Sequence, residues 1–450
     1  MSRHTKSVTA IKRLLLATSM LFVTITAQAQ LDPALDWPDF YDPKAIRELH
    51  FKIQHSDWNT IRGDTTFDIE VPVLFWTAHE GEDDAVLVSI RRKSATSING
   101  KVSFKIDINE YDDFPQDGGV KIWHELKKLS LENGDDQDVV REALAWYLHR
   151  LAMVAVYPGG HTPGLANWVT LTAHVVANQG EFEFDGAETV EPQGVYVSVE
   201  QPDKRYLKNR DIWDGDQTWL YKQDDIGLPE RKEVGCEDDD EEGDSPTVHI
   251  LQCTPFQLAS GKGRNRVRPP DCTFDEMNDN IDMNIMLAQG AVEAFSSNRD
   301  GMFTNVKNFY WSDRSNATCD QPLGVTLRSH FPWDLDAAIA ADNANVYGKP
   351  GRKRGQTVLK QTEVQRVILD EEVFRSLYND LLGEIVGTDY IDAATQYLDD
   401  MEPVLEPFLN ADPNSKMEDS VAEHFDTIRA WLLSRAANVA DQICSDGGPC

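Results

Sequence analysis

The chain has 450 residues, with 76 acidic side chains against 43 basic ones, which gives a formal net charge of −33. Such an excess of negative charge repels phosphate groups, so nucleic acids and anionic lipid surfaces are poor partners for this protein. The length suits one large domain or two ordinary ones.

The first 29 residues have the pattern of a secretory signal. A basic start precedes an apolar run at residues 14–25, and Ala27-Gln28-Ala29 forms a small-x-small cleavage site. We therefore expect cleavage after Ala29 and export of the mature protein to the periplasm or the extracellular medium. The signal holds four positive charges and no acidic ones, so cleavage takes the net charge from −33 to −37. No later run is as long and apolar, so we expect no membrane attachment once the signal is removed.

A leader at residues 30–46 is followed by segments that alternate in the manner of strands. We predict strands at residues 48–53, 66–76, 86–90, 103–108, 168–175 and 195–200. From residue 138 the apolar positions recur at helical spacing instead, which predicts one early helix that contains Glu142. We assign residues 47–202 to a β-rich N-terminal lobe.

The second half of the chain changes character twice. Residues 203–270 are polar and predict an insertion, whose acidic centre at residues 236–244 is typical of a solvated loop. A calcium site there stays open, although the run lacks the spaced EF-hand pattern. Residues 271–450 have mostly helical periodicity and predict a helical C-terminal lobe. The expected helices are at residues 279–295, 364–382 and 421–443. The predicted fold class is therefore α+β, with a two-lobed, atypical protein-kinase-like arrangement.

An even number of cysteines in an exported chain predicts disulfides. The six are Cys236, Cys253, Cys272, Cys319, Cys444 and Cys450. Six cysteines allow 15 pairings, among which we favour the neighbours, Cys236 with Cys253 and Cys444 with Cys450. The absence of a CxxC spacing argues against a structural zinc site.

Three short motifs in the middle of the chain carry the chemistry. Asp300 ends an Asn-Arg-Asp motif, Asn308 begins an Asn-Phe-Tyr-Trp motif, and Asp334 and Asp336 lie in Pro-Trp-Asp-Leu-Asp. Carboxylate and amide oxygens that are fixed beside rigid apolar stretches are what Mg²⁺-dependent phosphoryl transfer needs.

Further motifs occur in a fixed order along the chain, at residues 91–93, 101–106, 127–133, 141–142, 194–200, 220–222 and 332–336. Through them the chain resembles the spore-coat CotH kinase family of atypical secretory protein kinases, from about residue 49 to residue 443. The resemblance implies binding of ATP with Mg²⁺ or Mn²⁺. It also implies transfer of the γ-phosphate to Ser or Thr hydroxyls of a protein substrate, which the sequence does not identify.

The resemblance also assigns roles to the residues of the central motifs. Asp300 takes the place of the catalytic carboxylate that orients the attacking hydroxyl, and Asn308 and Asp334 take the places of metal ligands. Asp336 is a second candidate ligand. An Asp in this position also caps helices, and residues 335–340 look able to start one. We favour the ligand role for Asp334 and the cap for Asp336.

On the nucleotide side, Lys105 has the place of the lysine that clamps the α and β phosphates, with Lys101 as its rival. Glu142 would pair with that lysine, and Glu200 would lie near the nucleotide base. A solvated surface role is the alternative for each of these side chains. The chain has no GxGxxG or GxxxxGK motif, so side chains would have to hold the phosphates.

The chain departs from the family pattern in two places. Residues 93–97 replace a Lys-Gly-Asn segment, and Lys307 stands where a His often precedes the asparagine. The basic segment at residues 349–354 occupies the place of a substrate or activation loop, or is a solvated loop. An exported pseudokinase or surface-assembly protein is the main rival function. A glycosidase with a carboxylate pair has no motif behind it.

Overall fold

A computed structural model describes residues 39–98, 100–108, 110–111, 116–117, 120–121, 123–124, 126–134, 138–155, 163–180, 182–213, 218–223, 230–233, 281–304, 307–315, 326–353, 356–360, 365, 369–415, 417 and 419–448. They all belong to one compact unit, Trp37–Cys450. The predicted signal, the acidic run at residues 236–244 and five of the six cysteines lie outside the described residues.

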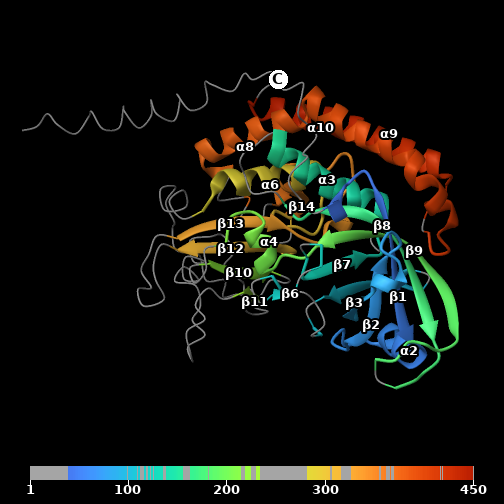
Figure 1. Ribbon diagram of the computed structural model, residues 1–450. Helices are drawn as coiled ribbons and strands as arrows, with labels where there is room; N and C mark the ends of the chain where they lie inside the picture. Colours follow the sequence, from blue (N-terminus) through green and yellow to red (C-terminus); the bar gives the residue numbers. More distant parts are fainter. Residues whose placement is uncertain are drawn as a thin grey trace, which may run out of the picture. The chain divides into compact units, whose positions relative to one another are not determined.

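Seven strands close into a barrel in the order β1-β2-β3-β4-β7-β9-β8 (Figure 1). They are β1 (Ile46–Gln54), β2 (Val71–Thr77), β3 (Val86–Ile98), β4 (Lys101–Asp107), β7 (Lys128–Glu132), β8 (Ala166–Val176) and β9 (Glu188–Glu200). The pairings are antiparallel except for β1 with β8, which is parallel and closes the ring. Alternate side chains such as Phe51, Val73, Ile90 and Phe104 fill the interior, as the period of two requires.

Helix α2 (His55–Gly63) contributes to the barrel core directly after β1. Trp58 and Ile61 are buried in that core, and the Trp58 ring lies 6.0 Å from the Phe104 ring. The sequence did not predict this helix. Its polar composition leaves two apolar positions, which is too few for a periodic signal.

A second sheet has the order β11-β10-β12-β13. Its strands are β10 (Thr218–Gln223), β11 (Glu230–Glu233), β12 (Phe309–Ser315) and β13 (Thr326–Pro332), and all its pairings are antiparallel. A buried ion pair between Asp313 and Arg328 joins β12 to β13, with Nε to Oδ1 at 2.8 Å. The prediction of a helical C-terminal lobe is therefore incomplete. Two strands of this sheet come from the segment predicted as an insertion, and two lie beyond residue 271.

The long helices are α3 (Val139–Ala155), α6 (Met283–Phe295), α8 (Glu372–Ile385), α9 (Thr388–Ala411) and α10 (Val421–Ser445). Helix α6 packs on α8, α10 and strand β13, and α9 packs on α10 (Figure 1). Helix α3 contacts β8 and β9 of the barrel on one side and α6 and α9 on the other. The fold is thus α+β, as predicted. The closed barrel does not confirm the two-lobed kinase-like arrangement.

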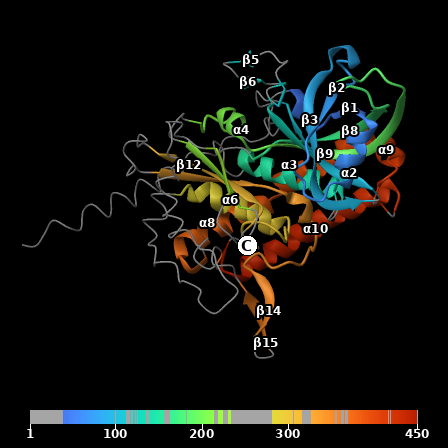
Figure 2. The same ribbon diagram turned by 90° about the horizontal axis from the view of Figure 1, so that it is seen from below.

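Shorter elements complete the described chain. They are η1 (Asp39–Tyr41), η2 (Glu82–Asp84), β5 (Gln116–Asp117), β6 (Val120–Lys121), α4 (Lys204–Lys208), η5 (Leu335–Ala337), β14 (Lys349–Lys353) and β15 (Gln356–Lys360). The basic segment at residues 349–354 is largely strand β14, and Figure 2 shows it paired with β15 in a hairpin. Within the described ranges, no helix combines the length and the apolar character needed to cross a membrane.

Candidate functional site

The loop that follows α6 brings Asp300 and Asn308 together. The Asn308 amide Nδ2 donates to Asp300 Oδ2 at 3.2 Å, and Lys307 Nζ lies 2.7 Å from the same oxygen. The Asp300 side chain is about a quarter exposed, so its carboxylate is accessible to a substrate. The backbone N–H of Asp300 donates to Asn298 Oδ1 at 3.0 Å, which tightens the turn.

Asp334 lies next to Asn308 because β12 and β13 are antiparallel neighbours. Asn308 precedes β12 and Trp333 follows β13, and the Trp333 N–H donates to the Asn308 carbonyl at 3.2 Å. Asn308 and Asp334 both adopt the left-handed conformation, with φ of 58° and 57°. Asn and Asp tolerate this region better than other residues with a side chain, so the two candidate metal ligands sit in tight turns that suit them.

Two further left-handed residues flank the Asp300 loop. Ser297 has φ of 50° and Ile339 has φ of 55°, and a β-branched residue in this region is strained. The Ile339 N–H donates to the Ser296 carbonyl at 2.6 Å. Ser297 Oγ accepts from the N–H groups of Ala340 and Ala341, each at 3.1 Å. These bonds hold the loop against the segment after Asp334.

The expected helix at residues 335–340 is only the three-residue 3-10 turn η5. Asp334 has the N-cap position, but its side chain makes no capping hydrogen bond, so the capping alternative for Asp334 is wrong. Asp336 lies in the first turn of η5 and is half-buried, and it does not hold the cap position that we favoured for it.

Lys93 on β3 is the lysine that the fold brings to Asp334. It forms an ion pair with Glu132 on β7, and its Nζ lies 4.8 Å from the centre of the Trp333 ring. Burial alone would lower the pKa of Lys93, but the charges of Glu132, Asp334 and Glu142 outweigh it and raise the pKa above its usual range. Lys93 is thus paired with Glu132, and the negative charges of Asp334 and Glu142 act on it as well.

Glu142 belongs to the same cluster, on the first turn of α3, where its side chain is buried. The expectation that Glu142 faces a strand lysine therefore has a geometric counterpart in Lys93. The sequence missed Lys93 and Glu132, although both lie in the motifs of the resemblance. A usable signal was the alternation of β7, which turns Glu132 to the face opposite the buried Leu129 and Leu131.

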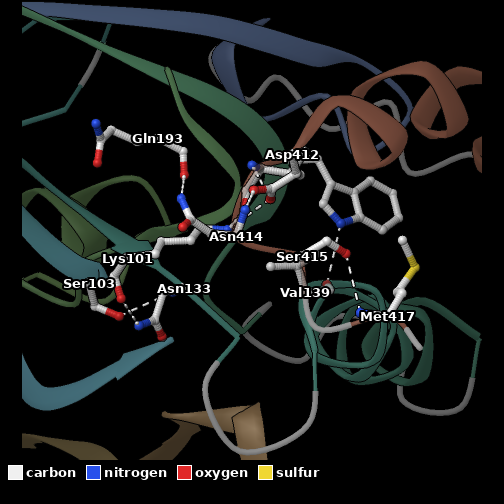
Figure 3. A network of polar contacts seen from close by, with 11 residues as sticks. Lys101, Ser103, Asn133, Val139, Gln193, Asp412, Asn414, Ser415 and Met417 are labelled. Atoms are coloured by element: carbon white, nitrogen blue, oxygen red, sulfur yellow. Dashed lines mark hydrogen bonds and ion pairs between the residues drawn. The ribbon is translucent and has the colours of Figure 1, made fainter. Parts of the chain in front are cut away.

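Lys105 and Lys101 have other neighbours. Burial, followed by the positive charges of Lys128 and Arg91, lowers the pKa of Lys105 to about 8. Lys101 is buried, and its Nζ donates to the Val195 carbonyl and lies 3.2 Å from Asp412 Oδ2 (Figure 3). The geometry thus favours Lys93 over both as a phosphate-binding lysine.

Glu200 is occupied by a buried ion pair. Its carboxylate oxygens lie 2.6 Å and 3.1 Å from the two terminal nitrogens of Arg210, and Oε2 also accepts from the Leu165 N–H at 3.2 Å. A carboxylate engaged in this bidentate way has little capacity left for a nucleotide base. The geometry therefore gives no support to the base-side role expected for Glu200.

The donor set fits Mg²⁺ or Mn²⁺ together with nucleotide phosphates. Among the described side chains, no group of three or more His, Cys, Asp or Glu residues is close enough to hold a metal ion by itself. Mg²⁺ commonly takes one or two carboxylates and completes its octahedral shell with phosphate oxygens and waters. Asp334, whose carboxylate is not used as a cap, and the Asn308 amide match that smaller requirement.

Comparison with known proteins identifies the family of the chain. A family model described as CotH kinase protein matches residues 88–439, which is most of the chain. The resemblance found in the sequence motifs is thereby confirmed. No curated protein matches the chain.

Proposed function

Because the chain belongs to the CotH kinase protein family, we propose that it is an active protein kinase. It transfers the γ-phosphate of ATP to Ser or Thr hydroxyls with the help of Mg²⁺ or Mn²⁺. One observation carries the proposal: the loop after α6 (Asp300 and Asn308), the turn after β13 (Asp334) and strand β3 (Lys93) bring their polar side chains into one cluster.

Lys93 is proposed to bind the α and β phosphates. Glu132 on β7 pairs with the ammonium, and the negative charge of Glu142 on α3 adds to its stabilisation, so the position of Lys93 is fixed before the nucleotide arrives. A lysine held by a glutamate is a recurring part of phosphoryl-transfer sites, where catalysis rests on positioning and electrostatic stabilisation.

Asn308 and Asp334 are the proposed metal ligands, and Asp336 stays a candidate. The metal ion, when bound, neutralises negative charge on the phosphates. The residues of this chain supply two oxygen donors on adjacent turns whose backbone is fixed by the bond from Trp333 to Asn308. The left-handed turns at Asn308 and Asp334, which Asn and Asp tolerate, support a site whose geometry is set in advance.

Asp300 is proposed to accept or orient the proton of the attacking hydroxyl. The bond from the Asn308 amide fixes the orientation of the carboxylate relative to the metal ligands. Lys307 adds a positive charge beside Asp300 Oδ2, in place of the histidine of the family pattern.

Export is proposed on the basis of the signal pattern at residues 1–29. The expected partners are a nucleotide and an unidentified protein substrate, and the acidic composition disfavours nucleic acid and membrane surfaces. The hairpin of β14 and β15 brings a basic segment into an otherwise acidic protein, so it is a candidate contact for an acidic substrate.

An exported pseudokinase or surface-assembly protein remains the rival function. It is favoured by the lack of a glycine-rich phosphate cradle and by the loss of the glycine and asparagine of the family's Lys-Gly-Asn segment, which reads Lys-Ser-Ala-Thr-Ser at residues 93–97. The hydrogen bond between Asp300 and Asn308 argues against this rival function. A protein without catalytic activity has no physical need to join the proposed catalytic carboxylate to the proposed metal-binding amide.

The proposal is tested with purified mature protein, labelled ATP and either Mg²⁺ or Mn²⁺, followed by mapping of the labelled residues. We expect Asp300→Asn to keep ATP affinity nearly unchanged and to lower phosphoryl transfer by about 10² to 10⁴-fold, the usual share of a positioned base. Transfer at the wild-type rate by this variant would remove Asp300 from the mechanism. ATP binding without any transfer by the wild type would establish the pseudokinase instead.

A further inference from the structure

A buried carboxylate, Glu293, holds the backbone that follows Asp300. Glu293 lies in the last turn of α6, and 1% of its surface is exposed. Its Oε1 accepts from the Met302 N–H and its Oε2 from the Phe303 N–H, both at 2.9 Å. The two donors follow Asp300 by two and three residues, so each carboxylate oxygen holds the backbone directly behind the catalytic carboxylate.

The space around this anchor is closed. A Cβ atom on Gly301 would lie 2.6 Å from the Glu293 carboxyl group, so the loop backbone packs directly on the carboxylate. One turn earlier on α6, a Cβ atom on Gly290 would lie 2.1 Å from the Phe303 ring. Glycine at both positions lets the loop approach the helix closely enough for both hydrogen bonds.

A carboxylate is a costly choice for this position. Burial raises the pKa of Glu293 to about 7, and the bonds from Phe303 and Met302 oppose that rise without cancelling it. A glutamine would fill the same space without a charge, but its amide offers one acceptor oxygen to two N–H donors. The ionised carboxylate can accept both bonds, and such charge-assisted bonds are stronger than neutral ones.

We propose that Glu293 is the positioning residue of the catalytic loop, which holds the backbone after Asp300 so that its carboxylate meets the attacking hydroxyl. The inference rests on the proposed kinase function for its catalytic consequence. The proposed role of Glu293 does not extend to nucleotide binding. The residues assigned to the nucleotide and its metal ion, Lys93, Asn308 and Asp334, are held by other contacts.

The test compares Glu293→Gln with the wild type in steady-state kinetics and in amide hydrogen exchange of the peptide covering residues 298–304. We expect kcat to fall by roughly 10 to 10²-fold, the effect of a small misplacement of a catalytic group, while KM for ATP stays within about twofold. We also expect faster exchange in the loop peptide.

Asp412→Asn is the matched control. Asp412 is also a buried carboxylate that accepts backbone N–H groups, from Val195 at 2.8 Å and Asn414 at 2.8 Å, but in the barrel contact of Figure 3. It should lower stability without changing kcat or exchange in the loop. Equal losses of kcat in both variants would reduce Glu293 to a merely structural residue and overturn the proposal.

Two further outcomes separate the inference from the kinase proposal. If the wild type transfers no phosphate, the kinase proposal fails, and loop exchange alone decides whether Glu293 anchors the loop. If Glu293→Gln does not fold, Gly301→Ala replaces it, because the added methyl group displaces the carboxylate while its charge remains. Wild-type loop exchange and wild-type kcat in the folded variant would overturn the inference.

Discussion

Lys93 and Lys105 lie on neighbouring strands of the barrel, yet their surroundings are opposite in charge. The negative charges of Glu132, Asp334 and Glu142 act on Lys93, whereas the positive charges of Lys128 and Arg91 act on Lys105. A phosphate-binding lysine has to be charged and fixed in place. The surroundings of Lys93 satisfy both requirements, and those of Lys105 disfavour the charge.

We therefore predict that Lys93→Met weakens binding of Mg-ATP by roughly tenfold or more, which corresponds to about 1.4 kcal/mol or more. Lys105→Met is the matched control and should leave the affinity unchanged. Isothermal titration calorimetry measures both. If Lys93→Met alone is unstable because Glu132 loses its partner, the double variant with Glu132→Gln restores the charge balance. If Lys105→Met weakened Mg-ATP binding more than Lys93→Met did, Lys105 would be the phosphate-binding lysine.

Glu293 also predicts a dependence of stability on pH. Its pKa is raised from the usual 4.5 to about 7 in the folded state, so the folded protein binds this proton more tightly than the unfolded chain does. The resulting stabilisation is fully present below pH 4.5 and is lost as the pH rises through about 7, a total of roughly 3 kcal/mol. Denaturant unfolding at several pH values measures it. Glu293→Gln should remove this part of the slope, and an unchanged slope in the variant would contradict the assignment.

Among the secondary-structure elements, regular periodicity decided what could be predicted. Strands β1, β3, β4 and β8 and helix α3 have strong alternation or helical spacing, and the structure has them near the predicted residues. Strands β10 and β11 were missed because their charged surroundings resemble a loop. The parallel pairing of β1 with β8, which closes the barrel, joins segments more than a hundred residues apart and leaves no local signal.

At the contact between the end of α9 and the barrel, we predict that Gly194 cannot be replaced by a residue with a side chain without a large loss of stability. Gly194 on β9 has φ of +96°, and a Cβ atom there would lie 2.0 Å from Asp412 Oδ1. Gly194→Ala would therefore displace the carboxylate that pairs with Lys101. We expect a loss of about 3 to 5 kcal/mol in the free energy of unfolding, the range for a broken buried ion pair.

Gly81→Ala is the control for this prediction. Gly81 has a similar φ of +83°, but a Cβ atom there meets no atom within 4 Å. It should cost only the backbone strain of about 1 to 2 kcal/mol. Denaturant unfolding of both variants gives the difference that belongs to the Asp412 contact. Equal losses would show that the contact contributes little.

At the scale of the whole molecule, the candidate site draws on β3, β7, α3 and the two turns that hold Asn308 and Asp334. Asp300, Asn308 and Asp334 could be predicted because each lies in a compact local motif. The lysine could not be chosen from the sequence, because a break in the register of β3 with β4 between Arg92 and Ser97 interrupts the simple alternation. That Lys93 lies near Glu132 on β7 and Glu142 on α3 follows from the closed barrel and could not be inferred from the sequence.

The oxidation state of the cysteines is a property of the whole chain. Cys444, near the end of α10, is disulfide-bonded, and its partner lies outside the described residues. Which cysteines pair therefore stays a prediction.

In freshly purified mature protein we expect thiol titration under denaturing conditions to find few or no free thiols among the six cysteines. Reduction should lower the melting temperature, because removing cross-links increases the freedom of the unfolded chain. Six titratable thiols would contradict both the disulfides and the argument from them for an oxidising compartment.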